Sequence, residues 1–168
     1  MLKAPDITRL LKEFAPLIAR VAATYEKDRA LQEDLIQDIS LVVWRALDSN
    51  DDNNNQFRGE SSLKTYIARI AHNRAVDHVI KEQRRLNDDQ EYDESTDTFS
   101  STDSSHEQAL DLMSGLHKLK ISYRQVIALQ LEGFTFQEIA TTLGLAEDAV
   151  AQRASRARQQ LARLMNRS

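Results

Sequence analysis

Apolar residues recur along most of this chain at steps of three and four positions, which is the spacing of one face of an amphipathic helix. The first stripe covers residues 6–25, the second covers 29–47 and the third covers 62–85. Asp6 and Asp28 precede the first two stripes, and we expect their carboxylates to cap the free amides of the starting helices. These stripes predict a helical bundle in the N-terminal half.

The third stripe changes side along its length. Ile67 and Ile70 share one face, whereas Val76 and Val79 lie on a face well rotated from it. Either the helix bends near Arg74 or its second half packs against a different neighbour. The sequence leaves both possibilities open.

Shorter stripes follow in the C-terminal part. Residues 106–119 carry an amphipathic pattern, and two capping boxes, Ser122 with Gln125 and Thr135 with Glu138, predict two more helix starts. With only four Gly and two Pro in 168 residues, the pattern as a whole predicts an all-α fold.

Two polar stretches interrupt the helical pattern. Residues 48–56 form an Asn- and Asp-rich loop, whose role the sequence does not explain, and residues 87–105 carry 7 acidic and no basic side chains. The second stretch cannot bury enough apolar surface to fold alone. We therefore expect a helical domain over 1–86, a flexible acidic linker over 87–105 and a second small helical domain over 106–168.

The net charge of −4 argues against nucleic-acid binding only if charge is averaged over the whole chain. The acidic excess lies in the expected linker, while basic side chains cluster on the third and on the last helix. Two separate basic helices are what a two-point grip on a polyanion requires.

One edge of the third helix carries Tyr66, Arg69 and Asn73. An aromatic ring, a guanidinium and an amide are groups that stack on bases, hold phosphates and read base edges. Lys64 and Arg74 add positive charge to the same helix. The alternative interpretation is a solvated face with a tyrosine at its rim.

The second helix places apolar side chains opposite its buried stripe. Leu41 and Trp44 fall on the same side as Asp34 and Gln37 when the helix is plotted at 100° per residue. Aromatic residues on an otherwise polar face are typical of a partner surface. Alternatively, another helix of the same domain covers Trp44.

The last two predicted helices form a helix-turn-helix. A short helix after Thr135 ends at Gly144, and a longer helix starts near Glu147. Arg pairs with guanine and Gln with adenine in the major groove, which the second helix of such a motif enters. The alternative is an ordinary helical hairpin with a basic surface. The expected outward side chains of the last helix are Gln152, Arg153, Arg156, Gln159 and Arg163.

Several function classes find no support in the sequence. The chain has no Cys, so disulfides, thiolate metal sites and a cysteine nucleophile are excluded. Its His residues show no ligand spacing, and no paired carboxylates suggest catalysis, so we expect no metal, no cofactor and no enzyme activity. No apolar run approaches the length of a membrane span and no signal peptide is seen, so we expect a cytoplasmic protein.

A series of motifs spread over nearly the whole chain resembles the bacterial extracytoplasmic-function (ECF) group of sigma factors. The motifs are Asp34-Leu35-Ile36-Gln37-Asp38 with Val43-Trp44-Arg45, Phe57-Arg58-Gly59-Glu60-Ser61-Ser62, Arg69-Ile70-Ala71-His72-Asn73-Arg74-Ala75, Glu138-Ile139-Ala140, and Arg153-Ala154-Ser155-Arg156-Ala157-Arg158.

The resemblance implies a removable subunit that joins core RNA polymerase and directs transcription initiation at promoters. The helix with Asp34, Gln37, Leu41 and Trp44 would dock on the clamp helices of the largest polymerase subunit, and the second domain would contact the flap of the second-largest subunit. The segment from residue 57 to 74 would open the minus-ten element, and the last helix would read the minus-thirty-five element. An anti-sigma factor is an expected further partner. The residues implied at the minus-ten element are Arg58, Lys64, Tyr66, Arg69, Asn73 and Arg74.

Residues 149–153 lack the lysine and the serine that are usual at the start of the family's recognition helix, and the Asn-rich loop before Phe57 looks like an insertion. Two single positions also depart from the family pattern. Ala146 stands where a small hydroxyl cap usually opens the recognition helix, and Tyr66 replaces the more usual tryptophan. The sequence also leaves open a free-standing helix-turn-helix regulator whose N-terminal half senses a ligand or dimerises.

Overall fold

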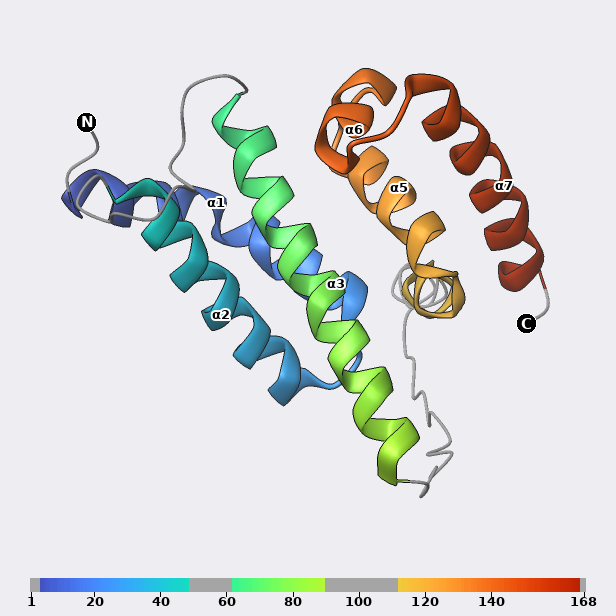
Figure 1. Cartoon of the computed structure of the whole chain (residues 1–168), viewed down its shortest axis with the longest axis horizontal. Coiled ribbons are helices and arrows are strands. Elements are labelled where there is room, and N and C mark those ends of the chain that lie inside the picture. The colour runs from blue at the N-terminus through green and yellow to red at the C-terminus, as the bar shows by residue number, and fades with distance from the viewer. Residues whose placement is uncertain (1–3, 49–61, 90–111, 167–168) are drawn as a thin grey trace, which may run out of the picture.

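The computed structural model describes residues 4–48, 62–89 and 112–166, and there the chain forms helices joined by short turns (Figure 1). The helices are α1 (Ala4–Tyr25), α2 (Arg29–Leu47), α3 (Leu63–Asp89), α5 (Ile121–Leu131), α6 (Phe136–Leu143) and α7 (Glu147–Met165). Residues 112–118 are also helical. The described ranges contain no strand, which confirms the all-α expectation.

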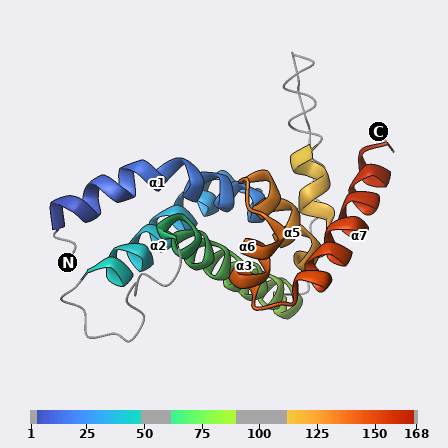
Figure 2. The ribbon, with the colours of Figure 1, turned by 90° about the horizontal axis from the view of Figure 1, so that it is seen from above.

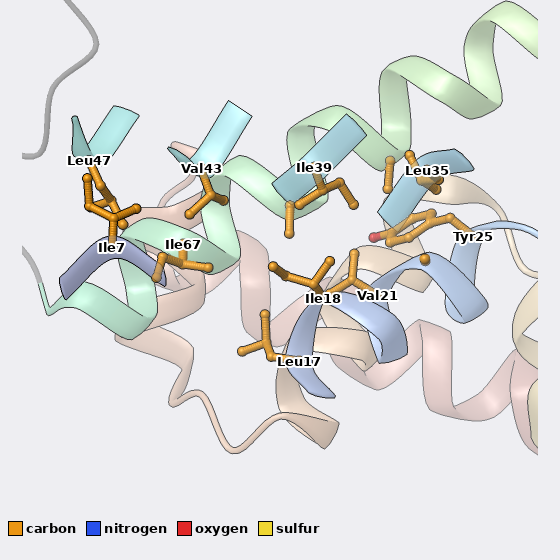
Figure 3. Packing of buried hydrophobic residues seen from close by; sticks show 13 residues of the cluster. Ile7, Leu17, Ile18, Val21, Tyr25, Leu35, Ile39, Val43, Leu47 and Ile67 are labelled. Atoms are coloured by element: carbon orange, nitrogen blue, oxygen red, sulfur yellow. The ribbon is translucent and has the colours of Figure 1, made fainter. Parts of the chain in front are cut away.

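The first unit is formed by α1, α2 and α3, which pack pairwise around a shared core. Ile18, Ile39, Val43 and Ile67 are almost completely buried there, and Figure 3 shows them projecting from the three helices towards one another. Burying such side chains contributes roughly 1.5–3 kcal/mol each, which is what holds three amphipathic helices together. The apolar stripes of the sequence therefore face inward as expected.

The second half of α3 stays with the same core. Val76 and Val79 pack against the cluster that contains Ile67, so this half does not turn to a different cluster. The intervening buried residues Ala71 and Ala75 are small and let α3 lie close to its neighbours.

The helix starts agree with the capping predictions at some positions and correct them at others. The Asp28 carboxylate accepts from the Leu31 amide at 3.1 Å, which confirms that cap. At the start of α3 the Ser62 hydroxyl accepts from the Thr65 amide at 3.1 Å. Asp6 is not an N-cap, because α1 already begins at Ala4 and Asp6 lies in its first turn.

The expected capping box at Ser122 is wrong. Helix α5 begins at Ile121, and its N-cap is Lys120, which makes no side-chain capping bond. The preceding helix ends at residue 118, and the short turn after it places Ser122 inside the first turn of α5. Arg124 stabilises the turn before α5: its Nη2 donates to the carbonyl oxygens of His117 and Leu119 at 2.7 and 3.0 Å.

The second unit contains the predicted helix-turn-helix. Thr135 and Glu138 form the complete capping box at the start of α6. Gly144 ends α6 with φ +68°, a left-handed conformation that glycine adopts without strain. Ile139, Val150 and Ala154 are buried between α5, α6 and α7, so the short helix packs firmly against the longer one.

The two units are in contact, and the sequence did not predict this. Helix α3 lies against α6 and α1 against α5 (Figures 1 and 2). Ala68 of α3 belongs to the core cluster of the second unit, next to Phe134 and Ile139. Helix α3 itself continues to Asp89, and the rest of the expected linker lies outside the described residues.

No helix in these ranges is both long enough and apolar enough to cross a bilayer.

Candidate nucleic-acid interface

The outward face of α7 is exposed to solvent. Gln152, Arg156, Gln159 and Arg163 are exposed, whereas Arg153 is half-buried because it lies nearer the side that packs inward. The inward positions are occupied by the buried residues Val150, Ala154, Ala157 and Leu161. Helix α7 therefore presents a row of Arg and Gln side chains on the second helix of a helix-turn-helix, where side chains that bind the major groove lie.

The start of α7 lacks a side-chain cap. Ala146 is the N-cap in an extended conformation, with φ −70° and ψ 147°, and it makes no side-chain hydrogen bond. Glu147 and Asp148 lie in the first turn, where negative charge interacts favourably with the helix dipole.

The edge of α3 that carries Tyr66, Arg69 and Asn73 is only partly exposed to solvent. Asn73 is exposed, but Tyr66 is half-buried and packs against the core of the first unit. Burial raises the pKa of the Tyr66 phenol above its ordinary value, and the nearby Arg69 charge opposes part of this rise. Arg58 lies outside the described residues.

The cations Lys64 and Arg69 reach the second unit. Lys64 Nζ donates to the carbonyl oxygen of Glu132 at 2.8 Å, and Arg69 Nη2 donates to the carbonyl oxygen of Thr141 at 3.0 Å. Arg69 Nε is buried without a hydrogen-bond partner among the described residues. Both side chains thus lie in the contact between the two units.

Arg74 lies on a different side of α3 from this edge. Its Nε and Nη2 donate to the Asp38 carboxylate of α2 at 2.6 and 3.0 Å, and these bonds lower the pKa of Asp38. A step of one residue turns a helix by about 100°, which carries Arg74 away from Asn73. The structure thus gives Arg74 a part in holding α2 against α3.

The face of α2 that was expected to bind a partner is partly exposed. Asp34 and Gln37 are exposed, and Leu41 is 48% exposed. Trp44 is half-buried and packs against the core of the first unit, as the alternative interpretation expected.

The sequence analysis missed a buried polar pair in the first unit, which lies beside Arg124 of the second unit. The Tyr25 hydroxyl lies 2.9 Å from Nδ1 of His72, and the guanidinium of Arg124 lies 5.8 Å from the centroid of the Tyr25 ring. His72 is 1% exposed, and burial lowers the pKa of its imidazole to about 4. The only signal in the sequence was a histidine within a stripe of buried positions.

Among the residues that the structure describes, no group of His, Asp or Glu side chains is arranged to hold a metal ion.

Comparisons with known proteins identify both units. Residues 10–85 match the family Sigma-70 region 2, and residues 109–161 match Sigma-70, region 4. Over 151 residues the chain is 26% identical to the ECF RNA polymerase sigma factor SigM of two Mycobacterium tuberculosis strains, H37Rv and Erdman. The aligned part covers 88% of this chain and 69% of that relative.

Solved structures give the same result for the fold. The sigma factor RpoE, in complex with the anti-sigma factor NepR from Bartonella quintana, superposes with a TM-score of 0.73 at 26% identity, over 96% of this chain and 97% of that one. CnrH, in complex with the cytosolic domain of CnrY, superposes with a TM-score of 0.69 at 22% identity, over 99% of this chain and 91% of that one.

The alternative of a free-standing regulator assigned ligand sensing or dimerisation to the N-terminal half, but this half matches Sigma-70 region 2. Because the two matched regions together cover most of its length, the chain belongs to the sigma-70 family, within the ECF group of RNA polymerase sigma factors.

Proposed function

We propose that this chain binds core RNA polymerase through α2 and directs it to promoters through α3 and α7. The observation that carries the proposal is that one chain presents two open surfaces, the polar face of α7 and the face of α2 around Leu41. A DNA-reading face alone would suit any regulator, whereas the second surface is suited to a protein partner.

The α2 surface is proposed to dock on the clamp helices of the largest polymerase subunit. Leu41 supplies the apolar anchor, and Asp34 and Gln37 supply polar contacts at its rim. Trp44 is proposed to contribute to this surface at its border with the core of the first unit, against which it packs.

At the minus-ten element, α3 is proposed to hold an unstacked base and the neighbouring backbone. Asn73 is free to contact a base edge, and Tyr66 offers an aromatic ring at the same edge. Lys64 and Arg69 are proposed phosphate contacts, although both are also bonded to carbonyl oxygens of the second unit. Arg58 stays in the proposal, and Arg74 contributes indirectly by positioning α3 on α2.

At the minus-thirty-five element, α7 is proposed to enter the major groove. Gln152, Arg156 and Gln159 are suited to base edges, while Arg153 and Arg163 are suited to phosphates at the two ends of the contact. The second unit is also proposed to contact the flap of the second-largest polymerase subunit. This role is non-enzymatic and is carried out in the cytoplasm, where the polymerase works.

An anti-sigma factor is proposed as a further partner. The support is the likeness to RpoE, which was solved in complex with the anti-sigma factor NepR. Purification of the tagged chain from unstressed cells, with mass spectrometry of the co-purifying proteins, tests this; recovery of the chain with polymerase subunits alone would argue against it.

The test of the main proposal is gel filtration of the purified chain with core RNA polymerase, followed by binding of double-stranded promoter fragments. We expect the chain to elute with core and to bind promoter DNA tightly only in that complex. Failure to bind core, together with nanomolar binding of duplex DNA by the free chain, would favour the free-standing regulator instead.

A further inference from the structure

Asp148 is an acidic side chain on the polar face of α7, which the proposed function places in the major groove. It is exposed and lies one turn before Gln152, from which it is rotated by only about 40° at 100° per residue. Gln159 is rotated from it by about 20°, whereas Val150, which is buried, lies about 160° away. Asp148 therefore faces the same way as the Arg and Gln side chains proposed to contact DNA.

The Asp148 carboxylate has no hydrogen-bond or ion-pair partner within the part of the chain that the structure describes. Its half-buried neighbours Ala149 and Ala151 carry no charge. Arg153, the next cation along α7, is turned by about 140° from Asp148. The carboxylate is thus free to accept a hydrogen bond from a group outside this chain.

The start of α7 is shaped for a close approach to DNA bases. Ala146, Ala149 and Ala151 surround Asp148 with side chains of one methyl group each. An aspartate has a single methylene between its backbone and its carboxyl group, so it reaches a base edge only where the helix backbone comes close to the floor of the groove. The N-terminal residues of a recognition helix are those that contact base edges. The small neighbours therefore suit Asp148 to a direct base contact.

The helix dipole alone does not explain an acidic residue on this face. Glu147 and Asp148 both lie in the first turn of α7, where the partial positive charge of the helix start stabilises either carboxylate. Glu147 is turned by about 100° from Asp148 and lies off the polar face, so only Asp148 would face DNA. A carboxylate in this place is repelled by the phosphates unless a base offers it a hydrogen-bond donor.

In the major groove, only the amino groups of cytosine and adenine can donate to a carboxylate. Guanine presents the acceptors N7 and O6, and thymine presents the acceptor O4, all of which repel a negative charge. Adenine places its N7 acceptor beside its amino group, whereas the N4 amino group is the only polar group that cytosine presents. A carboxylate is therefore matched to cytosine.

We propose that Asp148 is a specificity-determining residue that selects cytosine in the upstream promoter element, beside the base contacted by Gln152. This assignment rests on the proposed function, because it requires α7 to enter the major groove at promoters. Where guanine or thymine stands at this position, the carboxylate would be desolvated against acceptors without a donor, which disfavours the site. Asp148 thus discriminates both by its bond to cytosine and by repulsion from the wrong bases.

The test is selection of promoter fragments by the full chain bound to core RNA polymerase, from a pool in which the upstream element is randomised, followed by sequencing. We expect cytosine at one position of the enriched element. Asp148→Asn keeps the length of the side chain but offers an amide, which pairs with adenine. The preference for cytosine over adenine at that position should fall by at least about fivefold, the low end for one base contact, while the other positions stay unchanged.

Glu147→Gln is the matched control, because it makes the same charge change in the same turn but off the polar face. We expect it to leave the base preference unchanged at every position. A second measurement compares the affinities of one complex for two promoters that differ only at the selected base pair. The ratio of these affinities cancels any general loss of stability or of polymerase binding in a variant, so a ratio lost in Asp148→Asn alone reports base recognition.

Three results would overturn the assignment: an enriched element without a cytosine preference, a cytosine preference that Asp148→Asn leaves unchanged, or an equal loss of this preference in Glu147→Gln. Each of them refutes the cytosine contact, while the enriched element itself still supports the proposed function. Failure of the proposed function gives a different result, because core polymerase would then enrich no upstream element that depends on the chain.

Discussion

His72 and Tyr25 form the most deeply buried polar contact in the first unit. The Tyr25 hydroxyl satisfies one ring nitrogen, while the other, Nε2, has no hydrogen-bond partner among the described residues. Because the imidazole is shielded from water on all sides, it is held neutral. The pair therefore makes the stability of the fold depend on pH.

We expect the free energy of unfolding to fall as pH is lowered from about 6.5, the ordinary pKa of histidine, to about 4, the pKa of His72. In this interval the unfolded chain takes up a proton that the folded chain excludes. The loss should be on the order of 3 kcal/mol at the lower end. Urea unfolding at a series of pH values measures it.

In His72→Gln this part of the pH dependence should disappear, leaving a smaller slope of the same sign from the partly buried His117, whose pKa is also lowered by burial. Tyr25→Phe serves as the control, because it removes the hydroxyl but leaves the imidazole buried. An unchanged pH slope in His72→Gln would show that His72 is not held neutral.

Leu41 allows the partner surface of α2 to be tested separately from folding. Leu41→Glu places a charge at a position that is 48% exposed, so we expect little change in stability but at least a tenfold loss of affinity for core polymerase. Leu86→Glu is the matched control, since Leu86 is 47% exposed on α3, outside the proposed docking face. Affinities from fluorescence titration that fall equally in both variants would remove the assignment. Trp44 is less suitable, because its packing against the core mixes the two effects.

At the scale of single residues, the sequence predicted exposure well where a helical face was unambiguous, as for Arg156 and Gln159. It did less well for Arg74 and Tyr66, which lie at the border between faces. At such a border the position of the side chain depends on the bonding partners that the neighbouring helix offers. For Arg74 this partner is the Asp38 carboxylate of α2.

The helices themselves follow from their apolar periods and their caps. The capping box of α6 and the Asp28 cap of α2 were predicted correctly, because a hydroxyl or carboxylate directly before an apolar stripe has few competing roles. The box expected at Ser122 failed because the preceding turn shifted the start of α5, and a turn of that length has no signature in the sequence.

Helix α7 starts at Ala146 without a side-chain cap. Its extended backbone already has the conformation of an N-cap, so Ala146→Ser needs only the hydroxyl to satisfy an amide of the first turn. We expect stabilisation by about 1 kcal/mol in urea unfolding. Thr135→Ala, which removes an existing cap from α6, should lower stability by a similar amount. No gain from Ala146→Ser would mean that Glu147 and Asp148 already meet this need.

At the scale of the whole molecule, the arrangement of the two units is what the sequence could not predict. Arg20 and Glu132 are 112 positions apart, and Lys64 and Glu132 are 68 apart. Neither pair belongs to a periodic pattern, and either charge alone is an ordinary surface residue. The family motifs predicted the role of each unit, but only the structure places the cations of α3 against the ends of α5 and α6.

The account as a whole is tested most directly by mapping transcript start sites from genomic DNA fragments with core polymerase, with and without this chain. We predict new start sites that share two upstream sequence blocks at a fixed spacing. Arg156→Ala should weaken promoter binding by about 1–3 kcal/mol, and transcription should fall selectively at promoters that depend on the upstream block. Arg158 is exposed on another side of α7, so Arg158→Ala should not discriminate between promoters. If core polymerase yields the same start sites with and without the chain, the account is contradicted.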